Sequence, residues 1–350
     1  MIYGLTDEHQ MIADTVRSFV EKEIYPHEEL VERTGEVPEE IAQEIKQKTL
    51  DLGFYACNFP ESVGCAGLNH VEFALVEREL GRGSMALNHF FGRPQNILMA
   101  CEGDQIERYL MPAVKGERMD ALAMTEPGVG SDLQSITTTA IKDGNGYRIN
   151  GAKTYISNGQ NADLIIVVAK TDPNERAKGI SLMLLETEGA EGFQRGKKLD
   201  KIGLDAADTS ELFFEDVFVP AENVLGGVEG KGFYQLMGEL PQERLVIAMG
   251  ACTGIEKALD TTIDYVKSRK AFGQTIWDFQ NTQFVLADLK ARGTAARVFV
   301  NDCIAKLLKG ELDVATASMA KYWCTELQGE VVDKCLQLHG GAGYINEYPI

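Results

Sequence analysis

The spacing of apolar residues changes twice along the chain, and this change constrains the fold more than any other feature of the sequence. Residues 5–116 and about 233–338 carry apolar side chains at helical spacing, whereas residues 117–226 hold short β-rich runs with turns between them. The pattern predicts an α+β protein, mainly helical, with a small antiparallel β domain between two helical domains. We expect the domains to be 1–116, 117–226 and 227–350.

Start and stop signals divide the N-terminal block into helices. The segment "TDEHQMIADTVRSFVEKEI" begins with Thr6 as a predicted N-cap. Its predicted buried face consists of Met11, Ile12, Val16, Phe19 and Val20. The segment "PEEIAQEIKQKTLDLG" opens on Pro38 and stops at Gly53, which is the expected chemistry of a helix start and end. Further helices are predicted for "NHVEFALVERELG" and "PQNILMACEG".

The middle block has strand signals. In "ITTTAIKDGNGYRINGAKTYIS" two alternating runs flank "DGNG", which predicts a β-hairpin. "ADLIIVVAK", "GISLMLLE" and "SELFFEDVFV" are predicted to be further strands. After "GGVEGKGF" we expect long helices at about 233–268, 279–309 and 313–338.

A carboxylate stands out in the segment "GELPQERLVIAMGA". Pro241 is typical of a helix start, and from Leu245 to Val266 the apolar residues recur at helical spacing. We therefore expect Glu243 in the first turn of this apolar helix. A glutamate there complements the helix dipole, which contributes about 0.3–1 kcal/mol and is an ordinary structural explanation.

Composition and charge exclude several classes of function. The chain has 350 residues and a formal net charge of −19, which disfavours binding to nucleic acid or to anionic membranes. Seven scattered cysteines predict reduced thiols, and five histidines lack metal-ligand spacing, so we expect no metal site. No signal peptide or membrane-spanning run is recognisable, and we expect a cytoplasmic protein.

The loop "LAMTEPGVGSD", residues 122–132, follows a short strand and concentrates proline, glycine, serine and aspartate. Its glycines would let a ligand approach the backbone, and successive N–H groups favour an anion. The loop matches neither a dinucleotide-binding glycine motif nor a P-loop. From the residues alone, an ordinary β-turn and a loop beside phosphates both remain open.

Four separated motifs resemble one family. The loop at 122–132, "KTYISNG" at 153–159, "SRKAFGQTIWDFQ" at 268–280 and "QLHGGAGY" at 337–344 are similar, in order and spacing, to the acyl-CoA dehydrogenase flavoproteins. The pattern is closest to the long-chain and isovaleryl branches, and it covers essentially the whole chain. The resemblance implies an N-terminal helical domain, a middle β domain and a C-terminal four-helix bundle.

The resemblance also implies an FAD site shared between subunits of a homo-oligomer, either a dimer or a tetramer of two dimers. The residues implied to hold FAD within one subunit are Leu122, Met124, Thr125, Gly130, Ser131, Tyr155, Ile156 and Ser157. Those implied to contact the FAD of a neighbouring subunit are Arg269, Phe272, Gln280, Gln337, Leu338, His339, Gly340 and Gly341. Without the resemblance, these residues would be explained as an ordinary strand, a surface cation and a turn that ends a helix.

The same resemblance gives Glu243 a catalytic role. In the family a glutamate removes the α-proton of an acyl-CoA thioester while flavin N5 accepts the β-hydrogen as hydride. The long-chain and isovaleryl branches place this base at "ERL", which here is "PQERL". The implied substrate contacts are Ser131, Tyr234, Pro241, Gln242 and Arg244; Arg244 is nearly as well explained as a structural ion-pair residue.

The implied reaction is dehydrogenation of a fatty or branched acyl-CoA to the trans-2-enoyl-CoA in fatty acid β-oxidation, with electrons passing to electron-transfer flavoprotein. The alternatives are a flavin oxidase or monooxygenase of the same fold, and a non-catalytic acyl-CoA-binding protein. Met237, Leu240, Phe90 and Phe91 would favour medium, long or branched chains, whereas Arg93 could favour a distal carboxylate or be structural. Relatives continue past "NEYPI", so we expect the last segment of the family to be missing.

Overall fold

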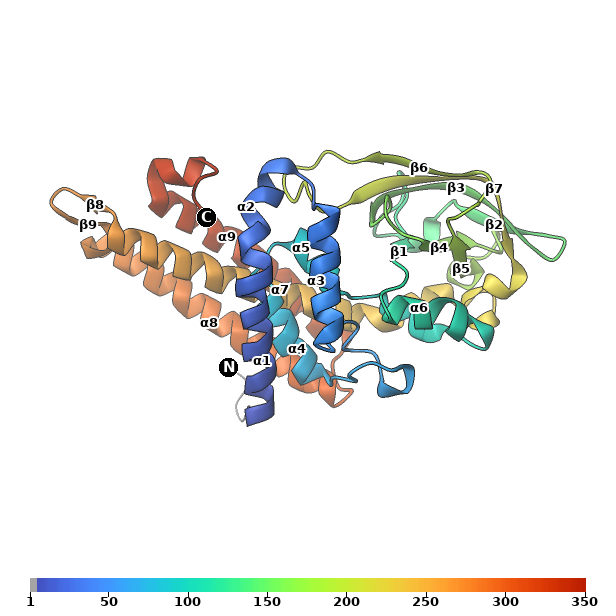
Figure 1. Cartoon of the computed structure of the whole chain (residues 1–350), viewed down its shortest axis with the longest axis horizontal. Helices are drawn as coiled ribbons and strands as arrows, with labels where there is room; N and C mark the ends of the chain where they lie inside the picture. The colour runs from blue at the N-terminus through green and yellow to red at the C-terminus, as the bar shows by residue number, and fades with distance from the viewer. Residues whose placement is uncertain (1–4) are drawn as a thin grey trace. The chain divides into compact units, whose positions relative to one another are not determined.

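The computed structural model describes residues 5–350, and these residues form two compact units (Figure 1). The helical unit consists of the described residues up to Lys22, Asn69–Gly83 and Leu240–Ile350. The sheet unit consists of Glu23–Leu68 and Ser84–Glu239. Helix α7 starts in the sheet unit and continues into the helical unit, so the chain passes between them within one helix.

Long helices build the helical unit. They are α1 (Asp7–Phe19), α4 (His70–Leu80), most of α7 (Gly232–Ser268), α8 (Gln280–Leu308) and α9 (Val314–His339). Helix α4 packs against α1 and against α8, and α8 runs beside α9 (Figure 1). The predicted cap at Thr6 is confirmed, since its side chain accepts a hydrogen bond from the His9 backbone N–H at 3.2 Å. The three predicted C-terminal helices are also confirmed, with ends that differ by one or two residues.

The apolar stripe of α7 forms the core of the helical unit. Its members that are at most 3% exposed are Leu245, Ala248, Met249, Cys252, Ile255, Leu259 and Val266. Their spacing of three and four residues places them on one face of the helix. Helix α8 approaches this face closely at its residue Gly293. A Cβ built on Gly293 would lie only 2.8 Å from Ile255 Cγ2 of α7, so a larger residue would force the helices apart.

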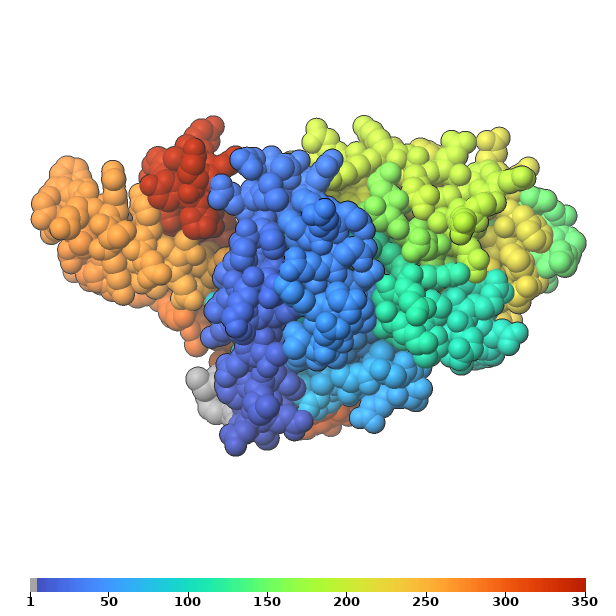
Figure 2. Space-filling model, in the orientation of Figure 1, coloured from blue at the N-terminus to red at the C-terminus, as the bar shows by residue number. Residues whose placement is uncertain are grey.

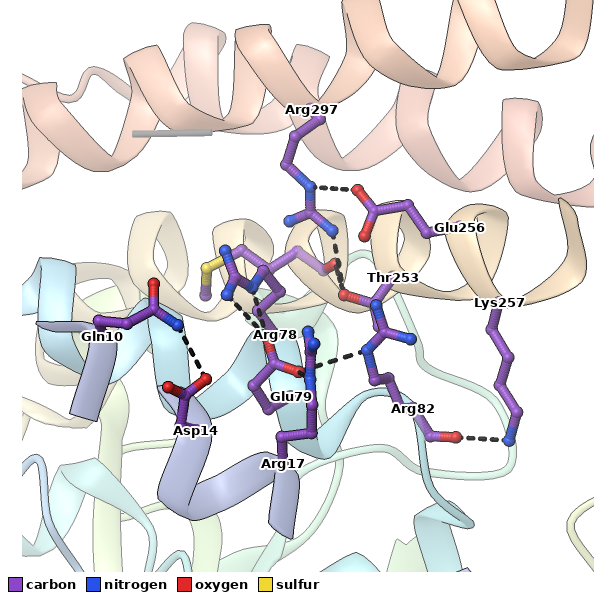
Figure 3. A network of polar contacts seen from close by, with 11 residues as sticks. Gln10, Asp14, Arg17, Arg78, Glu79, Arg82, Thr253, Glu256, Lys257 and Arg297 are labelled. Atoms are coloured by element: carbon purple, nitrogen blue, oxygen red, sulfur yellow. Dashed lines mark hydrogen bonds and ion pairs between the residues drawn. The ribbon is translucent and has the colours of Figure 1, made fainter. Parts of the chain in front are cut away.

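A buried carboxylate joins α4 to α1 (Figure 3). The Glu79 side chain is 0% exposed and is surrounded by Arg17 at 2.9 Å, Arg78 at 2.7 Å and Arg82 at 3.3 Å. Burial pushes the pKa of Glu79 upward, but hydrogen bonds and charge from Arg17 and Arg78 outweigh burial and hold that pKa below its ordinary value. The carboxylate is therefore ionised, and it neutralises part of the charge of three arginines.

The sheet unit contains a seven-stranded, mostly antiparallel sheet in the order β1-β4-β2-β3-β7-β6, with β5 paired to β4. The strands are β1 (Asp120–Ala123), β2 (Thr139–Asp143), β3 (Gly146–Ser157), β4 (Leu164–Lys170), β5 (Ile180–Glu186), β6 (Phe193–Lys198) and β7 (Thr209–Pro220). The predicted hairpin is confirmed, because Asp143 pairs with Gly146 across a two-residue turn. Strand β1 is parallel to β4, which makes the sheet mixed instead of purely antiparallel.

Both faces of the sheet are buried at strand β4. Along β4, Leu164, Ile166 and Val168 belong to one apolar cluster, whereas Ile165, Val167 and Ala169 belong to another. Strand alternation produces this division, since successive side chains point to opposite faces. The first cluster includes residues from the segment Ile106–Leu110 and from α6 (Met111–Val114), which pack on that face.

Helices α2 (Tyr25–Thr34), α3 (Glu39–Asp51) and α5 (Met85–Asn88) complete the sheet unit. The start of α3 after Pro38 is confirmed, and Gly53, which follows its end, has the left-handed φ of 74° expected of a stop.

Three local expectations were wrong or incomplete. Met11 is 68% exposed, so it lies outside the buried face of α1. The predicted helix in "PQNILMACEG" is a short 3₁₀ segment, Asn96–Ala100, because Cys101 returns to extended backbone. Strand β6 was not predicted, because "FQRGKK" lacks apolar alternation. Within residues 5–350, no helix has the length and apolar character needed to cross a membrane.

Candidate functional site

The site residues of the sheet unit lie where β1 ends. Strand β1 pairs with β4 in register from Asp120 to Ala123, and the chain then turns through residues 124–132. Glu126 and Val129 exchange two backbone hydrogen bonds of 2.9 and 3.1 Å, which close a tight turn. A Cβ added to Gly128 or Gly130 would meet no atom within 4 Å, so the outer side of this turn is open.

Tyr155 is held beside this loop in an unusual conformation. Its φ is 58°, and it sits where the pairing of β3 with β7 shifts register between Lys153 and Ile156. The Thr154 backbone N–H donates to the Thr125 carbonyl at 2.9 Å, which joins the bulge to the loop. A left-handed tyrosine costs about 1 kcal/mol or more, and bulges often redirect side chains at functional sites. The result is an aromatic side chain that is 66% exposed.

The alternation of β3 separates the predicted site residues into two sets. Tyr155 and Ser157 are exposed, whereas Ile156 is 2% exposed and belongs to the core of the sheet. Leu122 and Met124 are partly buried against the other cluster. Ile156 is therefore placed to support the strand, and the surface available to a ligand is formed by its two neighbours.

These features fit a flat, phosphate-containing cofactor. A planar ring could stack near the exposed Tyr155 side chain, and open glycine backbone permits close approach of phosphates. Ser131 is exposed beside Gly130 and offers a hydroxyl. Residues 5–350 contain no group of three or more His, Cys, Asp or Glu side chains that could hold a metal ion.

In the helical unit, Glu243 lies well inside α7. The expectation that it occupies the first turn was wrong, because α7 begins at Gly232 and continues through Pro241 without a break. A proline inside a helix removes the hydrogen bond to the carbonyl four residues earlier, here that of Met237. The helix dipole at an N-terminus therefore does not explain Glu243. Its side chain and those of Pro241, Gln242 and Arg244 are all half-buried.

Tyr234 lies in the part of α7 that belongs to the sheet unit. Its side chain is 52% exposed, and its ring packs edge-on against Phe233 with centroids 5.7 Å apart. An exposed aromatic side chain of this kind can contact a ligand.

The region after α7 forms a small exposed hairpin, β8 (Lys270–Ala271) and β9 (Gln274–Thr275). Its turn residues Phe272 and Gly273 have φ of 53° and 82°, as a two-residue hairpin turn requires. Phe272 is 95% exposed, and the hairpin lies at the end of the helical unit, among the orange atoms at the left of the space-filling view (Figure 2). Arg269 before it and Gln280 after it are also exposed.

The residues at the end of α9 do not form one surface. His339 is 3% exposed, stacks on Tyr265 with centroids 4.3 Å apart, and its carbonyl accepts from the Tyr265 hydroxyl at 3.1 Å. Gln337, Gly340 and Gly341 are exposed, and Leu338 is half-buried. His339 is thus a packing residue here, and its backbone neighbours remain accessible.

Two buried charges beside the loop were not predicted. Lys153 and Glu126 are 1% and 4% exposed and form an ion pair of 2.9 Å. A signal was present, because the period of two along β3 places Lys153 on the same face as the buried Tyr147 and Ile149. The partner could not be inferred, since Glu126 reaches this lysine only through the fold of the loop.

A small cavity of about 30 Å³ lies elsewhere in the sheet unit. Its lining includes Tyr55, His89, Arg93, Arg118, Asp120 and Asn158. Burial raises the pKa of Asp120 to about 7, although a hydrogen bond from the Gln95 backbone opposes this change. Burial has the opposite effect on His89 and lowers its pKa, because the charged form of an imidazole is the protonated one. Sequence reasoning singled out Arg93 here but not Asp120.

Three family profiles match the chain. They are described as "Acyl-CoA dehydrogenase, N-terminal domain" over residues 6–117, "Acyl-CoA dehydrogenase, middle domain" over 121–217 and "Acyl-CoA dehydrogenase, C-terminal domain" over 230–350.

Individual relatives agree with these profiles. The chain is 44% identical to "Long-chain specific acyl-CoA dehydrogenase, mitochondrial" of Sus scrofa, over 99% of this chain and 80% of that protein. It is 36% identical to "Isovaleryl-CoA dehydrogenase, mitochondrial" of Pongo abelii, over 100% and 83%. The crystal structure of an acyl-CoA dehydrogenase from Geobacillus kaustophilus matches with a TM-score of 0.93 and 41% identity, over 100% of this chain and 92% of that one. The chain belongs to the acyl-CoA dehydrogenase family.

Proposed function

We propose that the chain catalyses the FAD-dependent α,β-dehydrogenation of a fatty or branched acyl-CoA thioester to the trans-2-enoyl-CoA. The observation that carries this proposal is the exposed, left-handed Tyr155 beside the open loop that follows β1. Such strain persists only where the surrounding structure enforces it, and it concentrates at functional sites. Family membership gives this surface its ligand, which is FAD.

The proposed FAD contacts in the sheet unit divide by chemistry. Leu122, Met124 and Tyr155 would contact the ring, and Thr125 and Ser157 would donate hydrogen bonds to its polar atoms. Gly130 and Ser131 would approach the pyrophosphate. When bound, FAD would supply the acceptor for the β-hydrogen, which leaves as hydride.

Glu243 is the proposed catalytic base. An ionised carboxylate can accept the α-proton, which the neighbouring thioester carbonyl makes acidic. Its half-buried position on α7 supports this role, because partial burial limits the access of water to the side chain. Tyr234, Pro241, Gln242 and Arg244 are the proposed contacts with the thioester and its pantetheine chain.

We further propose a homo-oligomer in which a second subunit completes the FAD site. Support comes from exposed apolar side chains on α8, α9 and the β8–β9 hairpin of the helical unit. They include Phe272 at 95%, Phe284 at 65%, Tyr322 at 67% and Met319 at 54% exposure. Exposed apolar surface of this kind is typical of an interface. The proposed contacts with the FAD of the partner subunit are Arg269, Phe272, Gln280, Gln337, Leu338, Gly340 and Gly341, whereas the buried His339 would support this segment from within. A monomer with full FAD occupancy would contradict this arrangement.

The proposal also covers the domain boundaries, the location of the protein, its electron acceptor and its acyl chain. We propose domains at 1–116, 117–226 and 227–350, a cytoplasmic location and electron-transfer flavoprotein as the electron acceptor. Met237, Leu240 and Phe90 would contact a medium, long or branched acyl chain. Phe91, which was expected to join them, is only 3% exposed and packs in the core beside Phe54. Each buried CH₂ group would add about 0.8 kcal/mol to binding until the available surface is filled.

The test is an anaerobic titration of the purified FAD protein with acyl-CoAs of increasing chain length. We expect loss of flavin absorbance with an acyl-CoA and, in separate steady-state assays with an added electron acceptor, kcat/KM values that rise beyond butyryl-CoA. A kcat/KM that falls steadily beyond four carbons would refute the substrate preference. Rapid oxygen consumption without another acceptor would instead indicate an oxidase, and a protein that binds acyl-CoA without bleaching would be a non-catalytic binder.

A further inference from the structure

The ion pair between Lys153 and Glu126 lies at the base of the loop that follows β1. Both side chains are almost completely buried, and Lys153 Nζ lies 2.9 Å from Glu126 Oε1. Burying two charges carries a desolvation penalty of several kcal/mol per ion, and an apolar pair of similar volume is often as stable or more stable. Fold stability alone therefore does not explain why two charges are present.

Each charge also binds the polypeptide backbone. Glu126 Oε2 accepts from the backbone N–H and the hydroxyl of Thr137, both at 2.7 Å, and Oε1 accepts from the Thr138 N–H at 2.9 Å. Lys153 Nζ donates to the Met124 carbonyl at 3.1 Å. The pair thus ties the end of β1 to β3 and to the segment that leads into β2.

The tied backbone is the one that carries the proposed FAD contacts. Met124 comes directly before Thr125, and Thr125 accepts the hydrogen bond from Thr154, the residue between Lys153 and Tyr155. Lys153 is buried while Tyr155, two residues later and beyond the bulge, is exposed. Lys153 therefore bonds the loop from the buried side of β3, whereas Tyr155 places its aromatic ring at the surface.

We propose that Lys153 and Glu126 are positioning residues for the cofactor. They fix the backbone from Met124 to Glu126 against β3, so that Thr125 and Tyr155 form one preorganised surface for FAD. This inference rests on the proposed function, because it takes FAD as the ligand of that surface. Preorganisation increases affinity because less ordering remains to be done on binding.

The pKa values of both side chains favour an ion pair at neutral pH. Burial raises the pKa of Glu126, but the charge of Lys153 and hydrogen bonds from Thr138 and Thr137 outweigh it and bring that pKa to about 2. Burial lowers the pKa of Lys153 to about 8, against the opposing charge of Glu126. Both groups are mainly charged at neutral pH, so the hydrogen bonds to Met124 and to the threonines are charge-assisted and correspondingly strong.

The test compares Lys153→Met, Lys153→Arg and Glu126→Gln with the wild-type protein. Lys142→Met is the matched control, because it removes an exposed lysine of the same sheet that pairs with Glu229 at 2.8 Å. Two quantities are measured: the Kd of the apoprotein for FAD, and hydrogen exchange of the loop amides, including those of Thr137, Thr138 and Thr154, in the apoprotein.

For Lys153→Met, measured where the variant is folded, we expect FAD affinity to fall at least tenfold and the loop amides to exchange faster. The urea midpoint should fall as well, because Glu126 is left buried without its charged partner. Lys153→Arg should recover part of the FAD affinity, because a guanidinium can still bond Glu126. Glu126→Gln keeps the shape of the side chain, and it should speed exchange at Thr137 and Thr138 even if Lys153→Met does not fold.

Unchanged FAD affinity and unchanged exchange in Lys153→Met or Glu126→Gln, beside a wild-type protein that binds FAD, would overturn the inference. So would a loss of affinity that follows a loss of global stability and is not recovered in Lys153→Arg. Failure of the wild-type protein to bind FAD would instead refute the proposed function.

Discussion

Replacing Asp120 by asparagine should change how the stability of the protein depends on pH. Asp120 opens β1 and is 6% exposed, and each of its carboxylate oxygens lies 3.3 Å from the Gln95 backbone nitrogen. Two such long contacts to one N–H compensate poorly for the loss of hydration. Burial therefore raises the pKa of this carboxyl from 3.8 to about 7.

The sign of the pH dependence of unfolding follows from the number of protons bound in the folded and in the unfolded state. Between about pH 4 and about pH 7 the folded protein keeps the Asp120 proton, whereas the unfolded chain has released it. The folded state binds more protons in this range, so the free energy of unfolding falls as the pH rises through it. Three pKa units at about 1.4 kcal/mol each give a loss of about 4 kcal/mol. A water molecule in the adjoining cavity of about 30 Å³ would solvate the anion, so we expect about 2–4 kcal/mol.

Asparagine keeps the shape of the side chain and cannot ionise. The free energy of unfolding of Asp120→Asn, relative to wild type, should therefore grow by about 2–4 kcal/mol between pH 4 and pH 8. Urea unfolding of the apoprotein, followed by circular dichroism at several pH values, measures this difference. Asp104→Asn, which alters an exposed carboxyl of the same unit, is the control. A difference between Asp120→Asn and wild type that stays constant across this range would refute the reasoning.

Three further substitutions test other parts of the structure. Glu79→Gln should lower the free energy of unfolding by about 3 kcal/mol in urea titrations, because three arginines lose a buried anionic partner; a change below 0.5 kcal/mol would contradict this. Gly92→Ala should cost about 1–3 kcal/mol, since its φ is 90° and a Cβ would lie 2.0 Å from the Tyr55 ring; a wild-type melting curve would contradict it. Tyr155→Ala should weaken FAD binding roughly 2–10-fold by fluorescence titration, and unchanged affinity would remove this residue from the site.

Regular elements were predictable because their period and end signals are local. Thr6 and Asn69 cap α1 and α4 through bonds to residues two or three positions away, and the "DGNG" turn brings its own two strands together. Strand β6 escaped prediction because its pairing with β7, and not its own composition, makes it a strand. Such pairing depends on distant sequence.

The candidate site was predictable in part. Its residues were identified through the four family motifs, and the loop glycines gave an independent local signal. The predicted position of Glu243, in the first turn of its helix, was wrong because Pro241 resembles a helix start yet lies inside α7. The Lys153–Glu126 pair and the raised pKa of Asp120 could not be found, since both follow from burial by segments far apart in the sequence.

The most direct test of the central claim is the rate of flavin reduction in Glu243→Gln after anaerobic mixing with an excess of acyl-CoA. The amide keeps the shape of the side chain but cannot accept the α-proton, so we expect the rate to fall about 10²–10⁴-fold while FAD and acyl-CoA still bind. Asp260→Asn, which alters an exposed carboxyl on the same helix, should reduce the flavin at the wild-type rate. A Glu243→Gln protein that binds both ligands and bleaches at a rate close to wild type would show that another residue is the base.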